Sequence, residues 1–168
     1  ADGPKASACV SRVRDAMTPT QQAGQLIMAA MQPGPATSLD QVIRAQGLGS
    51  MLYLGGWQDR STVAAASQHL QEVAPTVDGT KVGMLVAADQ EGGEVQQLTG
   101  TGFTPMPSGL EQAQDADLRA SAKAWGSELK QAGVNVNLAP VADTVPADIG
   151  RANEPIGKWG RQYGSTPE

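Results

Sequence analysis

The sequence has little of several residue types on which common sites and partners depend. Its 168 residues contain one cysteine, Cys9, and one histidine, His69, so no Cys/His cluster with metal-ligand spacing occurs. Lys and Arg number 12 against 17 Asp and Glu, and a net charge of −5 would repel a phosphate backbone. No apolar run approaches the ~20 residues that span a bilayer. We therefore expect no metal or other cofactor, no nucleic-acid partner and no membrane span.

The single cysteine leaves two interpretations open. Cys9 is a free thiol, or it is bonded to a cysteine beyond Glu168, since an odd cysteine in a secreted protein raises that question. Residues 1–8 are small and polar, as a mature N-terminus can be after signal removal, although an arbitrary start of the chain would look the same. We predict a secreted or envelope-associated protein with a bonded Cys9.

Apolar runs bounded by turn formers alternate with helical patterns along the chain. The predicted strands are 25–31, 47–54, 81–88 with its core at 85–88, and 134–139. The predicted helices are 10–17, a turn from Thr18-Pro19, 38–46, 62–73 and 115–132. Four strands that alternate with helices indicate βαβ units, a parallel sheet and right-handed crossovers.

Two α/β architectures suit four such units. A closed (β/α)₈ barrel needs about 250 residues, so this chain is either half of a barrel or a complete, small, open sheet. The sequence stops at Thr166-Pro167-Glu168, where a helix cap and a proline would normally start the next helix. We therefore predict that residues 1–168 form the first half, about four βα units, of a single TIM-type (β/α)₈ barrel domain.

Two carboxylates and two glycines directly follow the third predicted strand, in Asp89-Gln90-Glu91-Gly92-Gly93. Ligands bind at the C-terminal tips of parallel strands in α/β folds. Asp89 and Glu91 would share a face, about 6.5 Å apart at Cα. Retaining glycosidases place two carboxyl groups ~5–5.5 Å apart, so the pair suits a glycosidase site. Acids at a strand end more often only cap a helix or a turn, so the pattern alone leaves both roles open.

Four further residues near predicted strand tips are candidate ligand contacts. Asp143 follows the fourth strand, and Arg161 lies beyond it, where a guanidinium fork could grip a carboxylate or two sugar hydroxyls. A charge in such a loop is more often only a solvated surface charge, so both roles stay open. Trp57 and Trp159 are predicted in loops where a sugar face could stack, with burial against a helix as the alternative.

Four stretches, in order along the chain, resemble the motifs of one enzyme family. Residues 89–98 (D-Q-E-G-G-E-V-Q-Q-L) are similar to D-Q-E-G-G-R-V-Q-R-L. Residues 17–26, 133–143 and 153–167 are similar to M-[ST]-x-x-x-K-x-G-Q-L, G-[IV]-N-x-[ND]-x-A-P-V-x-D and N-x-x-I-G-x-R-x-[FY]-G-x-x-P. The family is glycoside hydrolase family 3, in its bacterial β-N-acetylhexosaminidase branch.

The resemblance implies a fold, a reaction and roles for particular residues. The family's catalytic domain is a (β/α)₈ barrel, or a near variant, that hydrolyses glycosides with retention through an Asp nucleophile and without a metal. By resemblance, Asp89 and Arg161 bind the sugar in the −1 subsite, and Glu91 is not the nucleophile. The nucleophile, the His acid/base and a Lys-His pair would lie beyond Glu168, so we expect no catalytic group within the chain. Glu91, Asp143, Trp57 and Trp159 remain as residues near the substrate.

Two departures from the family pattern support a second hypothesis. Glu94 and Gln97 stand where the motif usually has arginine, which puts any contact made by those arginines in doubt. The first hypothesis is a β-N-acetylhexosaminidase that acts on terminal N-acetylglucosaminides of peptidoglycan or chitin type. The second is a non-catalytic carbohydrate-binding or scaffolding paralogue. Both expect an amino-sugar ligand and a remaining half of the barrel, in the same polypeptide or as a second chain.

Overall fold

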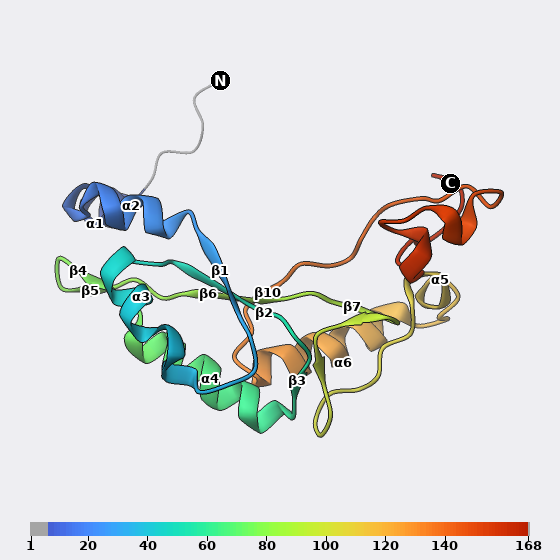
Figure 1. Ribbon diagram of the computed structural model, residues 1–168, viewed down its shortest axis with the longest axis horizontal. Helices are drawn as coiled ribbons and strands as arrows, with labels where there is room; N and C mark the ends of the chain where they lie inside the picture. Colours follow the sequence, from blue (N-terminus) through green and yellow to red (C-terminus); the bar gives the residue numbers. More distant parts are fainter. Residues whose placement is uncertain (1–6, 168) are drawn as a thin grey trace.

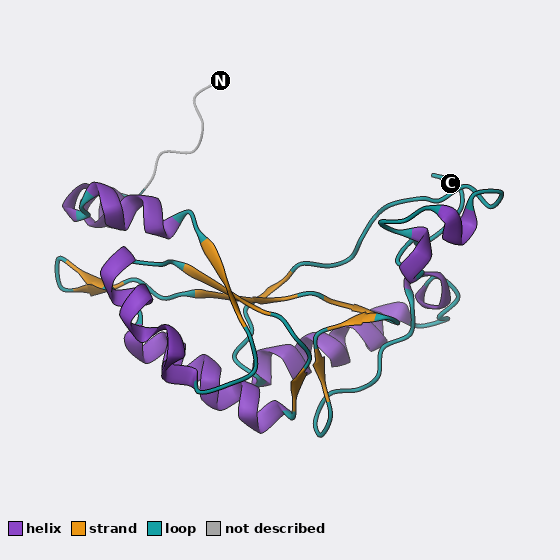
Figure 2. Ribbon diagram, in the orientation of Figure 1, coloured by secondary structure: helices purple, strands orange, loops and turns teal. Residues whose placement is uncertain are grey.

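A four-stranded parallel sheet lies at the centre of the computed structural model, which describes residues 7–167 (Figures 1 and 2). Its strands are β1 (Met28–Met31), β2 (Ser50–Tyr53), β6 (Leu85–Ala88) and β10 (Val136–Asn137), in the order β1-β2-β6-β10. Each strand is parallel to its neighbour. Because the spatial order follows the chain order, the sheet winds in one direction, as in a barrel.

The helices follow the predicted pattern with shifted boundaries. They are α1 (Ala8–Ala16), α2 (Pro19–Gln25), η1 (Ala36–Leu39), α3 (Asp40–Gln46), α4 (Arg60–Val73), α5 (Gly109–Gln112), α6 (Leu118–Gln131), η2 (Gly150–Ala152) and η3 (Gly157–Trp159). The first predicted strand was too long at its start. A capping box between Thr18 and Gln21 begins α2, and this helix takes Gln25 out of the strand.

Three short strand pairs were not predicted. They are β3 (Trp57–Gln58) with β9 (Leu98–Thr99), β4 (Thr76–Val77) with β5 (Thr80–Lys81), and β7 (Gln90–Gly92) with β8 (Val95–Gln96). Lys81 therefore belongs to a hairpin before β6 and not to the third main strand. Two- and three-residue strands show no hydrophobic period, so the sequence pattern does not reveal them.

The helices α3, α4 and α6 cover one face of the sheet, below it in the view of Figure 1. Met51, Tyr53 and Val86 face this helix layer and are fully buried. The opposite face has apolar side chains but no covering layer among residues 7–167. There, Met28 and Leu85 occupy equivalent positions on β1 and β6 and are 36% and 51% exposed.

The presence of helices on only one face of the sheet identifies the architecture. Parallel sheets are normally covered on both faces, by helices in open folds and by the rest of the barrel wall in closed ones. An open doubly wound sheet would have helices on both faces, so that alternative is wrong. The chain forms part of a (β/α)₈ barrel, and its uncovered face is the barrel interior. No helix within the described residues is long and apolar enough to cross a membrane.

Candidate functional site

The Asp89–Gly93 segment leaves the C-terminal end of β6 and is held from both sides. The Gln90 side chain is buried; it donates to the Leu98 carbonyl at 2.8 Å and accepts from the Leu98 amide at 3.0 Å. The Asn137 side chain accepts from the Gln90 amide and donates to the Gln90 carbonyl, both at 3.1 Å. Since successive side chains alternate, fixing Gln90 inward turns Asp89 and Glu91 to the other side.

Gly92 lets this segment turn where no side chain fits. Its φ is +100°, and a Cβ at this position would collide with the carbonyl oxygen of Pro107. An L side chain rarely adopts such a φ, so glycine is required here by both backbone conformation and space. Gly93 also has a positive φ, +57°, and a Cβ there would lie 3.0 Å from Ser108 Cβ, so the turn uses both glycines.

Glu91 and Arg161, which lie 70 residues apart in the sequence, form a bidentate ion pair. Arg161 Nε donates to Glu91 Oε2 at 2.9 Å, and Nη2 donates to Oε1 at 2.8 Å. Arg161 Nη1 donates to the Pro155 carbonyl at 3.0 Å. Hydrogen bonding to Glu91 raises the pKa of the Arg161 guanidinium, which favours the charged form of the arginine.

The Asp89 carboxylate lies within electrostatic reach of this pair. Burial raises its pKa, the negative charge of Glu91 raises it further, and the positive charge of Arg161 partly offsets both. Asp89 and Arg161 therefore lie at the same end of the sheet, where we expected a common pocket. Among residues 7–167, no hydrogen bond reaches the Asp89 carboxylate, so its oxygens are available to a ligand. Their role in binding sugar stays a prediction.

Gln112 connects three parts of the site and was missed by the sequence analysis. Its buried side chain donates to the carbonyls of Glu91 and Pro107, each at 2.7 Å, and accepts from the Tyr163 hydroxyl at 2.6 Å. Burial, and then the charge of Glu91, raise the pKa of Tyr163. A glutamine in a short helix gives no sequence signal for such a position. The only available signal was Ser108, whose capping box begins α5.

One of the two predicted sugar-stacking tryptophans lies in the core. Trp57 is 2% exposed, its Nε1 donates to the Met31 carbonyl at 3.1 Å, and its ring packs edge-on against Tyr53 at 4.8 Å between centroids. Of the two alternatives for Trp57, the structure shows burial and not an exposed ring that could stack on a sugar, since β3 pairs with β9 and the ring lies in the core. Trp159 in η3 is 44% exposed, with Lys158 Nζ at 5.8 Å from its ring centroid, and remains a candidate. Asp143 is exposed, and its charge reaches Arg161.

The two departures from the family motif have local partners. Glu94 forms an exposed ion pair with Arg151, with Oε1 and Nη2 at 3.2 Å. Gln97 Oε1 accepts from the amides of Gly55 and Gly56 at 3.0 and 3.4 Å. An arginine cannot accept hydrogen bonds, so Gln97 performs a structural task here that the usual residue could not.

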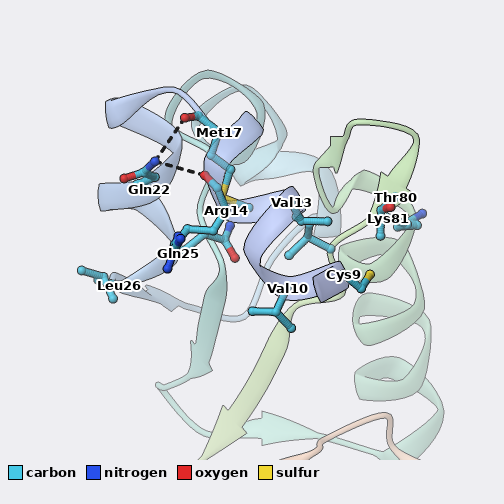
Figure 3. Close-up of a pocket in the computed structure, with 11 residues that line it drawn as sticks. Cys9, Val10, Val13, Arg14, Met17, Gln22, Gln25, Leu26, Thr80 and Lys81 are labelled. Carbon is cyan, nitrogen blue, oxygen red and sulfur yellow. Dashed lines mark hydrogen bonds between the residues drawn. The ribbon is translucent and has the colours of Figure 1, made fainter. Parts of the chain in front are cut away.

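Cavity volume alone does not locate the site. A cavity of about 360 Å³ lies beside Glu91, Gln112 and Tyr163, and one of about 500 Å³ lies beside Asp143 and Tyr163. A larger apolar groove, about 540 Å³, lies at the opposite end of the sheet between α1, α2 and the β4–β5 hairpin (Figure 3). That groove contains no predicted site residue. The convergence of Asp89, Glu91 and Arg161 at the strand ends is the stronger indication.

Fold and site together define a TIM-barrel-type chain with its polar site at the C-terminal ends of the strands, the usual place in this fold. The family comparison is specific: the family described as "Glycosyl hydrolase family 3 N terminal domain" matches residues 18–168. The chain belongs to this family. The resemblance inferred from the four motifs is thereby confirmed.

Several similar proteins carry names from the hexosaminidase branch of the family. The chain shares 36% sequence identity with the β-N-acetylhexosaminidase of Beutenbergia cavernae, whose crystal structure it matches with a TM-score of 0.82. The match covers 88% of this chain and 45% of that protein's chain. A family 3 β-N-acetylglucosaminidase from a Paenibacillus species is 31% identical, with a TM-score of 0.69 over 90% and 28%. A β-hexosaminidase of Xanthomonas axonopodis pv. citri is 33% identical over 129 residues, 71% of this chain and 34% of that protein. The chain therefore spans about a third of this relative's length.

Proposed function

We propose that the whole protein is a retaining β-N-acetylhexosaminidase that hydrolyses terminal N-acetylglucosaminides, and that this chain contributes one wall of the −1 subsite. The observation that carries the proposal is the Asp89 carboxylate, which accepts no hydrogen bond from residues 7–167 and lies within electrostatic reach of the Arg161 guanidinium at the strand ends. A carboxylate accepts from sugar hydroxyls, and a guanidinium donates to them, so the pair suits a neutral sugar. The names of the similar proteins support an N-acetylated hexosamine as that sugar.

In this proposal, the chain binds and orients the sugar, and the remainder of the barrel supplies the chemistry. Retaining glycosidases need a nucleophile and an acid/base group, which split one displacement into two steps. We expect both groups, and a Lys-His pair, from the part of the barrel that covers the open face of the sheet. That part belongs to the same polypeptide or to a second chain.

The test is an assay of the full-length protein. We expect it to release nitrophenol from 4-nitrophenyl N-acetyl-β-D-glucosaminide much faster than from the corresponding β-D-glucoside. Proton NMR should show a β-configured product first, because two displacements retain configuration. No release from either glycoside, together with measurable binding of N-acetylglucosamine, would favour the carbohydrate-binding paralogue instead. The Glu94 and Gln97 departures are the observation behind that second candidate.

We further propose that the protein is secreted or attached to the cell envelope, with Cys9 bonded to a cysteine outside residues 1–168. Cys9 is exposed and forms no disulfide within the described part of the chain. We expect cell fractionation of the native host to recover the protein outside the cytoplasm. Peptide mapping of that material without reduction should place Cys9 in a disulfide-linked peptide. A free Cys9 thiol in the exported protein would contradict the pairing.

A further inference from the structure

We infer that Glu91 is a positioning residue that holds the Arg161 guanidinium away from Asp89, so that both Asp89 and Arg161 stay free for a ligand. The inference rests on the proposed function and extends it, because it gives Glu91 a task that is neither nucleophilic nor in direct contact with sugar. Of the two acids in the Asp-x-Glu pattern, Asp89 would then bind the ligand and Glu91 would bind Arg161.

The hydrogen bonds of Arg161 show which donors remain. A guanidinium has five N–H donors. The Nε donor and one Nη2 donor go to Glu91, and one Nη1 donor goes to the Pro155 carbonyl. One N–H on Nη1 and one on Nη2 have no partner among residues 7–167. Glu91 therefore fixes the orientation of the group and leaves two donors for hydroxyl oxygens.

Burial separates this ion pair from a surface pair. The side chains of Glu91 and Arg161 are 7% and 27% exposed, and the Glu91 carbonyl is held by Gln112. By contrast, Glu94, on the same hairpin as Glu91, has a side chain that is 49% exposed. Its partner Arg151, in η2, has a side chain that is 72% exposed, and the two share one contact. A buried bidentate pair is rigid, whereas an exposed single contact contributes little. The Glu94 pair is thus a matched control.

Arg161 has a choice of acidic partners, which is why its orientation needs fixing. Glu91 acts on it most strongly, and the charges of Asp89 and Asp143 reach it as well. One guanidinium among three carboxylates pairs with the acid that offers the best geometry. If Glu91 lost its charge, Asp89 would be the next partner, and an Arg161–Asp89 pair would consume the acceptors that we assign to the ligand.

The test uses the full-length protein and begins with the crystal structure of Glu91→Gln. One amide N–H of the new side chain would face an Arg161 N–H, so the fork cannot persist. We expect the guanidinium to move to within hydrogen-bonding distance of Asp89. A guanidinium that stays in its present place would overturn the inference, whether or not the protein is an active glycosidase. If it moves and the unmodified protein hydrolyses no glycoside, the proposed function fails while the positioning role stands.

Kinetics provides the second readout. Misplacing a binding group by about 1 Å can cost 10²-fold, so we expect Glu91→Gln to lower kcat/KM by about that factor. In an Arg161→Ala background, Glu91→Gln should lower kcat/KM by less than about a further threefold, because Glu91 acts through Arg161. Glu94→Gln should stay within about twofold of the unmodified enzyme. Equal losses from Glu91→Gln in both backgrounds would show an independent role and contradict the inference.

A further variant covers failure to fold. If Glu91→Gln yields no folded protein, Glu91→Asp keeps the charge but is one methylene too short to close the fork on Arg161. We expect a displaced guanidinium and a reduced kcat/KM in that variant as well. An unchanged Arg161 position in Glu91→Asp would count against the inference.

Discussion

Asp89→Ala in the full-length protein is expected to lower kcat/KM for an aryl N-acetyl-β-glucosaminide by about 10²–10⁴-fold. A hydrogen bond to a charged group contributes ~1.5–3 kcal/mol, and a carboxylate with two sugar hydroxyls makes two of them. The loss of ~3–6 kcal/mol of transition-state binding corresponds to that range of rates. Steady-state kinetics with the aryl glycoside measures the effect.

The control for Asp89→Ala is Asp148→Ala. Asp148 is an exposed acid between β10 and η2, outside the cluster of Asp89, Glu91 and Arg161. Its replacement removes the same charge and should change kcat/KM by less than about twofold. Thermal unfolding of both variants separates a loss of binding from a loss of fold. An Asp89→Ala enzyme within threefold of the unmodified one would refute the assignment of Asp89 to the sugar.

The isolated 168-residue chain is expected to show no glycosidase turnover and to self-associate in solution. On the open face of the sheet, Met28, Leu85 and Leu138 are 36%, 51% and 44% exposed. Burial of one such side chain contributes ~1.5–3 kcal/mol, whereas a whole domain has only ~5–15 kcal/mol of net stability. The strands β1 and β10 are also open edges with unpaired backbone groups. Light scattering on the purified chain measures its mass.

A pair of substitutions tests whether the open face causes the association. Leu85→Ser on this face should reduce self-association of the isolated chain. It should lower the melting temperature of the full-length protein, where we expect the rest of the barrel to bury this residue. Leu110→Ser in α5, where the side chain is 43% exposed, should do neither. A cooperative, monomeric isolated chain would show that the sheet needs no further cover.

Local patterns made the main elements predictable. The four sheet strands are apolar runs between turn formers, and α6 ends where predicted because Gly133 takes a φ of +75°. The start of α6 was less accurate. Asp117, and not Asp115, accepts from the helix amide of Ala120, while Asp115 accepts from Ser121. Two acids in one turn are both suitable caps, and only the packed structure selects between them.

The sequence by itself determined the order of the βα units and the placement of Asp89 and Glu91 at a strand tip. These features depend on periodicity and on neighbours along the chain, which the sequence states directly. Only the tertiary structure decided that Glu91 pairs with Arg161 across 70 residues, that Gln112 joins Glu91 to Tyr163, and that Trp57 is in the core. Each of these depends on which distant side chains the packed sheet brings together. Burial then makes such a contact decisive, because a buried charge or polar group must find a partner.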